Sequence, residues 1–123
     1  MEKKKILIID DEADLVTLYT KFLEAHNYEV ISALEAKEGI ILAAQKMPDL
    51  ILLDIKMPGV GGLFAYKDIR YAERTATIPI ILISALSKEA IEALAREIKA
   101  EGYVHKTCEP AELLSKIKEV LKE

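Results

Sequence analysis

Three short runs of consecutive apolar residues constrain the fold of this chain more than any other feature. They are Ile6–Ile9, Leu50–Leu53 and Ile80–Ile83, and each contains only isoleucine and leucine. A strand with one face in water alternates apolar and polar residues, whereas a strand of a parallel sheet is covered on both faces and is apolar throughout. The three runs therefore predict central strands of a parallel sheet. Glu29–Ala33 and Tyr103–His105 are weaker candidates for two further strands.

Amphipathic patterns typical of helices separate these runs. Apolar residues recur at spacings of three and four over residues 15–23, 91–98 and 113–121. Gly102 is a candidate for the end of the fourth helix, and Pro110 for the first turn of the fifth. Parallel strands need crossover connections, which place helices on both faces of the sheet. We therefore predict an α/β fold with a doubly wound five-stranded parallel sheet and five helices, in a single domain over residues 1–123.

Composition limits the classes of partner. A chain of 123 residues that is 51% apolar has the size of one domain with a real core. Its formal charge of −4 gives no basic field for nucleic acid or an anionic membrane, so we expect neither as a direct partner. No apolar run is long enough for a membrane span, and the single cysteine, Cys108, cannot form an internal disulfide. These features favour a soluble protein of the cytoplasm.

Polar side chains follow the predicted strands where each strand ends. Asp10 and Asp11 follow the first strand and Asp54 the third, while Ser84 ends the fourth and Lys106 follows the fifth. Because ligands of such sheets bind outside the carboxyl ends of the strands, we expect these residues to share one rim. Carboxylate oxygens suit a hard divalent cation, which in cells is Mg2+. The sequence therefore predicts a magnesium site on this rim.

Each of these residues also has an ordinary structural explanation. The acidic pair could cap the following helix and interact with its dipole, and Asp54 could be a turn residue. Ser84 alone could be a loop hydroxyl, and Lys106 alone a solvated surface charge. The coincidence of all of them at strand ends on one rim favours a functional site over capping alone.

Four motifs resemble the receiver domain of two-component response regulators, in the same order along the chain. They are Asp10-Asp11-Glu12, the segment LLDIKMPG at 52–59, Ser84-Ala85 and Lys106, and the resemblance extends from about Lys4 to Leu121. It implies a flavodoxin-like fold, as in chemotaxis regulators, with strand order 2-1-3-4-5. It also implies phosphoryl transfer from a phosphohistidine of a sensor histidine kinase or a histidine phosphotransfer protein to an aspartate.

The resemblance assigns roles to the residues that match the motifs. Asp54 is the implied phosphoacceptor, which attacks phosphorus in line and forms an acyl phosphate. The implied Mg2+ ligands are Asp11 directly, Asp10 mostly through water, Asp54, and the backbone carbonyl of Lys56. Small phosphodonors such as acetyl phosphate should also serve, because the metal supplies much of the catalysis.

A second group of residues is implied to contact the phosphoryl group and to report its presence. Lys106 is the second cation on the phosphoryl group, and Ser84 with the backbone N–H groups near Lys56 and Ala85 binds its remaining oxygens. Movement of Ser84 would let Tyr103 turn inward as a switch. The face formed by the fourth helix, the fifth strand and the fifth helix would then bind an output protein or effector domain. Tyr103 is equally compatible with a half-buried strand aromatic that does not move.

The chain departs from the common receiver pattern in three places. The Val60-Gly61-Gly62 stretch predicts a more mobile loop than is usual for the fold. Lys56 and Leu86 occupy positions that tune hydrolysis in the family, where they could shield the phosphoryl group from water. Thr107 follows Lys106 where relatives carry proline. Because a cis bond before a residue other than proline costs about 3–4 kcal/mol, we predict a trans Lys106–Thr107 bond and a rearranged path into the helix at Pro110.

The function that fits all these residues is a phosphoaccepting switch. Such a protein catalyses only its own phosphorylation and dephosphorylation and is not otherwise an enzyme. A receiver-like docking module that binds partners without phosphorylation is the alternative from a different class. A metal-dependent phosphatase would need an aspartate two residues after the nucleophile as acid and base, and Lys56 occupies that position.

Overall fold

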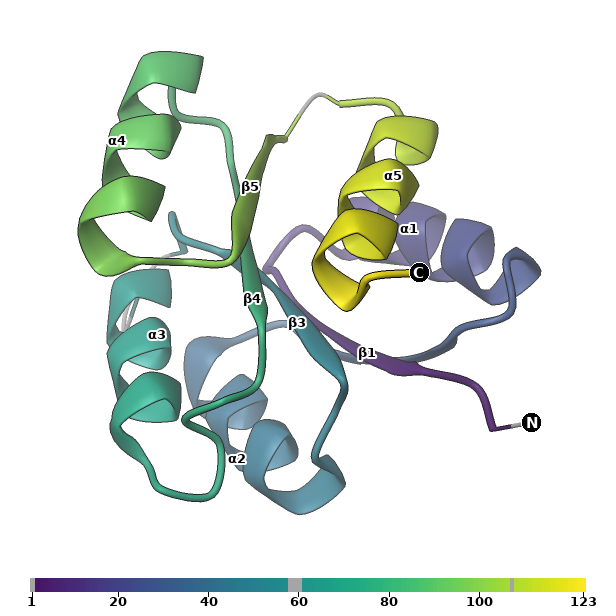
Figure 1. Ribbon diagram of the computed structural model, residues 1–123, viewed down its shortest axis with the longest axis horizontal. Helices are drawn as coiled ribbons and strands as arrows, with labels where there is room; N and C mark the ends of the chain where they lie inside the picture. Colours follow the sequence, from purple (N-terminus) through teal and green to yellow (C-terminus); the bar gives the residue numbers. More distant parts are fainter. Residues whose placement is uncertain (1, 58–60, 107) are drawn as a thin grey trace.

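A computed structural model describes residues 2–57, 61–106 and 108–123, and over these residues the chain forms one parallel sheet flanked by helices (Figure 1). The strands are β1 Lys5–Ile9, β2 Glu29–Ala33, β3 Leu50–Asp54, β4 Ile80–Ser84 and β5 Gly102–His105. The helices are α1 Ala13–Ala25, α2 Ala36–Lys46, α3 Gly62–Tyr71, α4 Lys88–Ile98 and α5 Pro110–Leu121. The strand order is β2-β1-β3-β4-β5, which confirms the predicted doubly wound, flavodoxin-like fold.

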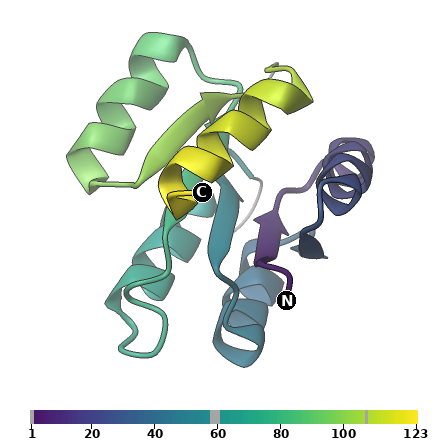
Figure 2. The same cartoon turned by 45° about the vertical axis from the view of Figure 1, so that its right-hand side comes forward.

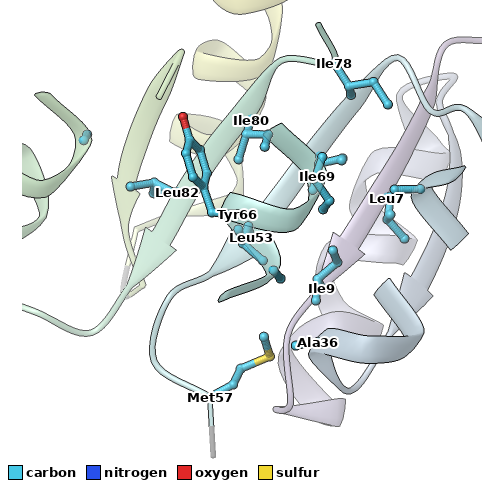
Figure 3. Close-up of a cluster of buried hydrophobic side chains, with 14 of the residues drawn as sticks. Leu7, Ile9, Ala36, Leu53, Met57, Tyr66, Ile69, Ile78, Ile80 and Leu82 are labelled. Atoms are coloured by element: carbon cyan, nitrogen blue, oxygen red, sulfur yellow. The ribbon is translucent and has the colours of Figure 1, made fainter. Parts of the chain in front are cut away.

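The helices form two layers, one on each face of the sheet. α2, α3 and α4 pack on one face, and α1 and α5 pack on the other (Figures 1 and 2). Side chains of each strand alternate between the layers, so that Leu7 and Ile9 join the first apolar cluster (Figure 3) while Ile6 and Ile8 join the second. Because both faces are covered, β3 and β4 carry a polar residue only at their last position, Asp54 and Ser84, which explains the apolar runs in the sequence.

One predicted helix end is wrong. α4 ends at Ile98 and not at Gly102, because Lys99 adopts the left-handed conformation with φ of 59° and its N–H donates to the carbonyls of Ala95 and Arg96. Gly102 instead begins β5, where an added Cβ would lie 3.2 Å from the Lys116 side chain on α5. The glycine therefore allows close packing of α5 on the sheet. Pro110 is the first residue of α5, as predicted.

Gly62 lets α3 begin directly against the end of β3. A Cβ at this position would overlap the backbone carbonyl oxygen of Asp54 and would lie 2.6 Å from the Cα of Ile55. Among the described residues, the nearest atom to a Cβ at Gly61 would be the Met57 carbonyl oxygen, at 3.5 Å. Residues 58–60 and Thr107 lie outside the described residues, so the predicted loop mobility and the predicted trans bond at Lys106–Thr107 both stay predictions.

Candidate functional site

Three carboxylates meet at the carboxyl ends of two neighbouring central strands. β1 and β3 pair in parallel with Ile9 opposite Leu53, so Asp10, which follows β1, lies beside Asp54, the last residue of β3. Oxygen atoms of Asp10, Asp11 and Asp54 lie within 4.8 Å of one another. Asp10 and Asp54 are buried, and Asp11 is exposed. The sheet topology therefore gathers the acidic residues that the sequence placed on one rim.

Lys106 joins this cluster from the far side of β4. Its Nζ lies 2.9 Å from Oδ2 of Asp54, 3.2 Å from Oδ1 of Asp10 and 2.8 Å from Oε1 of Glu12. The backbone N–H of Lys106 donates to the carbonyl of Ser84 at 2.8 Å, which holds the Lys106 backbone beside the end of β4. Its side chain is only 9% exposed. Lys106 is therefore a largely buried cation of the site and not a solvated surface charge.

Local backbone turns orient the two buried carboxylates. Oδ1 of Asp10 accepts the N–H of Glu12 at 2.9 Å, and Oδ1 of Asp54 accepts the N–H of Lys56 at 3.0 Å. Glu12 is the N-cap residue of α1, but its side chain makes no capping hydrogen bond. Capping of α1 therefore does not explain why Asp10 and Asp54 are buried around a lysine.

The electrostatics of the site leave the two buried aspartates short of positive charge. Burial raises the pKa of Asp10 and of Asp54 above the usual range, and the attraction of Lys106 does not offset it. Burial alone would lower the pKa of Lys106, but its hydrogen bonds to Glu12 and Asp54 outweigh this effect and raise it. A further cation would relieve the repulsion among the carboxylates. Oxygen ligands at this separation fit a hard cation such as Mg2+.

Ser84 lies at the end of β4, between the strands that carry Asp54 and Lys106. Its side chain is fully buried, and its hydroxyl oxygen accepts the N–H of Leu86 at 3.1 Å. The hydroxyl hydrogen is therefore left to donate to another acceptor. The next residue, Ala85, is exposed, as is Lys56 after β3. The Lys56 N–H donates to Asp54, so Lys56 borders the acidic cluster at the surface.

Tyr103 lies on β5 with its ring partly buried and its hydroxyl directed outward. The ring packs against the apolar cluster beneath α4, while the hydroxyl donates to Oε2 of Glu92 on α4 at 3.0 Å. This hydrogen bond raises the pKa of Tyr103. The structure therefore holds the predicted switch residue in an outward position.

Sequence reasoning missed two contacts of the site. Glu12 stood beside the acidic pair, but nothing in the sequence showed that it binds Lys106, 94 positions away. Glu92 carried no signal at all, because its contact with Tyr103 depends on how α4 packs on β5.

In the described part of the chain, no helix is both long and apolar enough to cross a membrane.

Comparison with known proteins gives one consistent result. The sequence profile of the response regulator receiver domain matches residues 6–118. The chain is 34% identical over 119 residues to the alkaline phosphatase synthesis transcriptional regulatory protein PhoP of Bacillus subtilis, covering 97% of this chain and 49% of that protein. It is 32% identical to protein PilH of Pseudomonas aeruginosa, covering 95% of this chain and 97% of that protein. The chain spans about half the length of the first curated relatives it matches.

Solved structures agree with these relatives. A putative response regulator from Chloroflexus aurantiacus superposes with a TM-score of 0.90 at 27% identity, over 98% of this chain and 99% of that one. The BeF3-activated receiver domain of Klebsiella pneumoniae RstA superposes with a TM-score of 0.86 at 30% identity, over 98% of this chain and all of the other. The likeness therefore extends over nearly the whole chain.

Proposed function

The chain belongs to the family of response regulator receiver domains, which are phosphorylated on an aspartate, and from this premise we propose that Asp54 is the phosphoacceptor. One observation carries the proposal: Asp54 is fully buried at the end of a central strand, with Lys106 at 2.9 Å and two further aspartates beside it. The donor in the proposal is a phosphohistidine of a sensor histidine kinase or a histidine phosphotransfer protein.

In the proposed reaction a carboxylate oxygen of Asp54 attacks phosphorus in line. The P–O bond forms as the P–N bond to the donor histidine breaks, and the product is an acyl phosphate on Asp54. Lys106 is already next to the attacking carboxylate and would neutralise charge on the phosphoryl oxygens. The Ser84 hydroxyl and the backbone N–H groups of Lys56 and Ala85 would donate to the remaining oxygens. In this structure the Lys56 N–H donates to Oδ1 of Asp54.

Receiver domains use Mg2+ at an acidic pocket, and the aspartate cluster of this chain suits such an ion. In our proposal Asp11 and Asp54 would hold it directly, Asp10 would hold it mostly through water, and the Lys56 carbonyl would complete the protein ligands. When bound, the ion supplies positive charge against the phosphoryl oxygens. Lys56 stands where a phosphatase would carry its acid and base. We therefore propose that the chain catalyses only its own phosphorylation and dephosphorylation.

We propose that the signal leaves through the face formed by α4, β5 and α5. Attraction of Ser84 to the phosphoryl group would free space for the ring of Tyr103, which would then leave Glu92 and turn inward. That face would bind an output protein or an effector domain. The match with PhoP of Bacillus subtilis, a transcriptional regulatory protein, covers 49% of that protein. With a net charge of −4, residues 1–123 act in this proposal as one cytoplasmic domain without direct contact to nucleic acid or membrane.

Mass spectrometry after incubation with acetyl phosphate and Mg2+ tests this function. We expect the unaltered chain to gain one phosphoryl group, Asp54→Asn to gain none, and the matched control Asp68→Asn, an exposed aspartate of α3, to behave like the unaltered chain. Unchanged mass in all three proteins would favour the docking module that acts without phosphorylation. A mass gain in Asp54→Asn equal to that of the unaltered chain would assign the reaction to another residue.

A further inference from the structure

Lys106 has three carboxylate partners, and they differ in their relation to the metal site. Asp10 and Asp54 belong to the aspartate cluster that could hold a cation, whereas Glu12 does not. The distance from Nζ is shortest to Glu12, at 2.8 Å, compared with 2.9 Å to Asp54 and 3.2 Å to Asp10. Glu12 is 59% exposed, while the side chains of Asp10 and Asp54 are 2% and 1% exposed. The lysine is therefore shared between the metal site and a carboxylate at its rim.

A divalent ion at the aspartates would compete with Lys106 for the same oxygen atoms. Oδ1 of Asp10 already accepts the N–H of Glu12 as well as the ammonium of Lys106. An ion that draws on the Asp10 and Asp54 carboxylates would therefore weaken the contacts of Lys106 to them and would repel its ammonium. Of the three partners, only Glu12 would keep its full capacity to accept from Lys106.

We propose that Glu12 is a positioning residue, which retains the Lys106 ammonium at the rim of the site when a divalent cation binds the aspartates. This inference rests on the proposed function, because it concerns the same lysine and the same cation. Glu12 does not touch the reacting atoms in this proposal and acts only through Lys106. Without the Glu12 carboxylate, an ion bound to Asp10 and Asp54 would leave the Lys106 ammonium with no carboxylate partner that the ion does not also bind. The ion would therefore bind less tightly.

The test is a titration with Mg2+ alone, followed by backbone amide chemical shifts in NMR spectra. We expect Glu12→Gln to weaken Mg2+ binding by about three- to tenfold, the size of a charge-assisted contact between partly exposed groups. The control Asp14→Asn removes a charge of the same sign from the first turn of α1. It should weaken binding less than Glu12→Gln does.

The decisive comparison repeats Glu12→Gln in a Lys106→Met background. If Glu12 acts through the lysine, its replacement there should have no larger effect than Asp14→Asn in the same background. An equal loss of affinity in both backgrounds would overturn the inference and would make Glu12 an ordinary long-range charge. Lys106→Gln supplies the same comparison should Lys106→Met not fold.

The titrations also distinguish failure of the Glu12 role from failure of the proposed phosphoacceptor function. If the unaltered chain neither binds Mg2+ nor accepts a phosphoryl group, the proposed function fails and the role of Glu12 fails with it. If the unaltered chain binds Mg2+ and Glu12→Gln binds as well as Asp14→Asn, only the positioning role is overturned.

Discussion

The ammonium of Lys106 lies 2.9 Å from the carboxylate of Asp54, although β4 lies between β3, which ends in Asp54, and β5, which ends just before Lys106. Each group is largely buried, with 9% of the lysine and 1% of the aspartate side chain exposed. The proposed phosphoacceptor is thus already paired with a cation before a phosphoryl group arrives. Lys106 also contacts Asp10, at 3.2 Å, so a single ammonium is shared between two buried aspartates of a cluster of three, and a further cation would balance the remaining negative charge.

Replacement of Asp10 by asparagine should stabilise the fold in the absence of divalent cations. Burial raises the pKa of Asp10, so the folded protein disfavours the charged carboxylate more than the unfolded chain does, and each pKa unit of difference corresponds to about 1.4 kcal/mol of unfolding free energy. The asparagine carbonyl can still accept the N–H of Glu12. We expect a higher melting temperature without Mg2+ and a smaller rise on its addition. Asp68→Asn is the control, and a lower melting temperature for Asp10→Asn without Mg2+ would contradict the electrostatic argument.

The affinity for Mg2+ should fall as pH falls, and this loss should begin at a higher pH than that at which a free aspartate side chain becomes protonated. The pKa values of Asp10 and Asp54 are raised from 3.8 by burial, and a protonated carboxyl group does not bind the ion. Between 3.8 and the raised pKa values, the metal-free folded state binds more protons than the unfolded state, so these two groups make the fold more stable as pH falls. Calorimetric titrations with Mg2+ from neutral to mildly acidic pH measure the loss of Mg2+ affinity. An affinity that stays constant until pH reaches 3.8 would contradict the raised pKa values.

Sequence patterns predicted the sheet well because burial on both faces leaves a signal within each strand. Runs such as Leu50–Leu53 need no knowledge of distant residues, and a parallel sheet then places every strand's carboxyl end on one rim. The position of Lys99 was not predictable in this way. Residues other than glycine rarely adopt a positive φ, so the sequence favoured Gly102 as the helix end.

The contacts of the site were less predictable than its residues. The pair of Glu12 with Lys106 depends on how far two side chains extend over the end of the sheet. The pair of Tyr103 with Glu92 depends on the packing of α4 against β5. Neither relationship is periodic in sequence, so only coordinates reveal it.

Substitution of Gly62 by alanine should destabilise the fold, whereas the same change at Gly61 should be tolerated. The added methyl group at Gly62 would overlap the carbonyl oxygen of Asp54, and backbone atoms must shift to make room. We expect a loss of about 2–3 kcal/mol for Gly62→Ala, as for other overpacked sites, and under about 1 kcal/mol for Gly61→Ala. Chemical denaturation measures both values. Equal losses for the two variants would contradict the close approach of α3 to β3.

Removal of the Tyr103 hydroxyl should favour the switched state of the protein. The hydroxyl holds the ring outward through its hydrogen bond to Glu92, and phenylalanine keeps the ring without that bond. If the ring turns inward on phosphorylation, Tyr103→Phe should bind the phosphoryl mimic beryllofluoride about two- to fivefold more tightly in the presence of Mg2+. Thermal melts over a range of beryllofluoride concentrations measure the affinity. Tyr71→Phe is the control because that side chain is 83% exposed; weaker binding by Tyr103→Phe alone would argue against an inward switch.

Chemical mapping of the phosphorylated residue tests the central claim most directly. Hydroxylamine converts an acyl phosphate into a stable hydroxamate, so treatment of the phosphorylated protein marks the acceptor before digestion with trypsin. The tryptic peptide of residues 47–56 contains both Asp49 and Asp54, and fragmentation of that peptide distinguishes them. We predict that the hydroxamate lies on Asp54 alone and forms only when Mg2+ was present during phosphorylation. A hydroxamate on Asp49, Asp10 or Asp11, or a phosphoryl group that resists hydroxylamine because it lies on Ser84, would contradict the assignment of Asp54 as the phosphoacceptor.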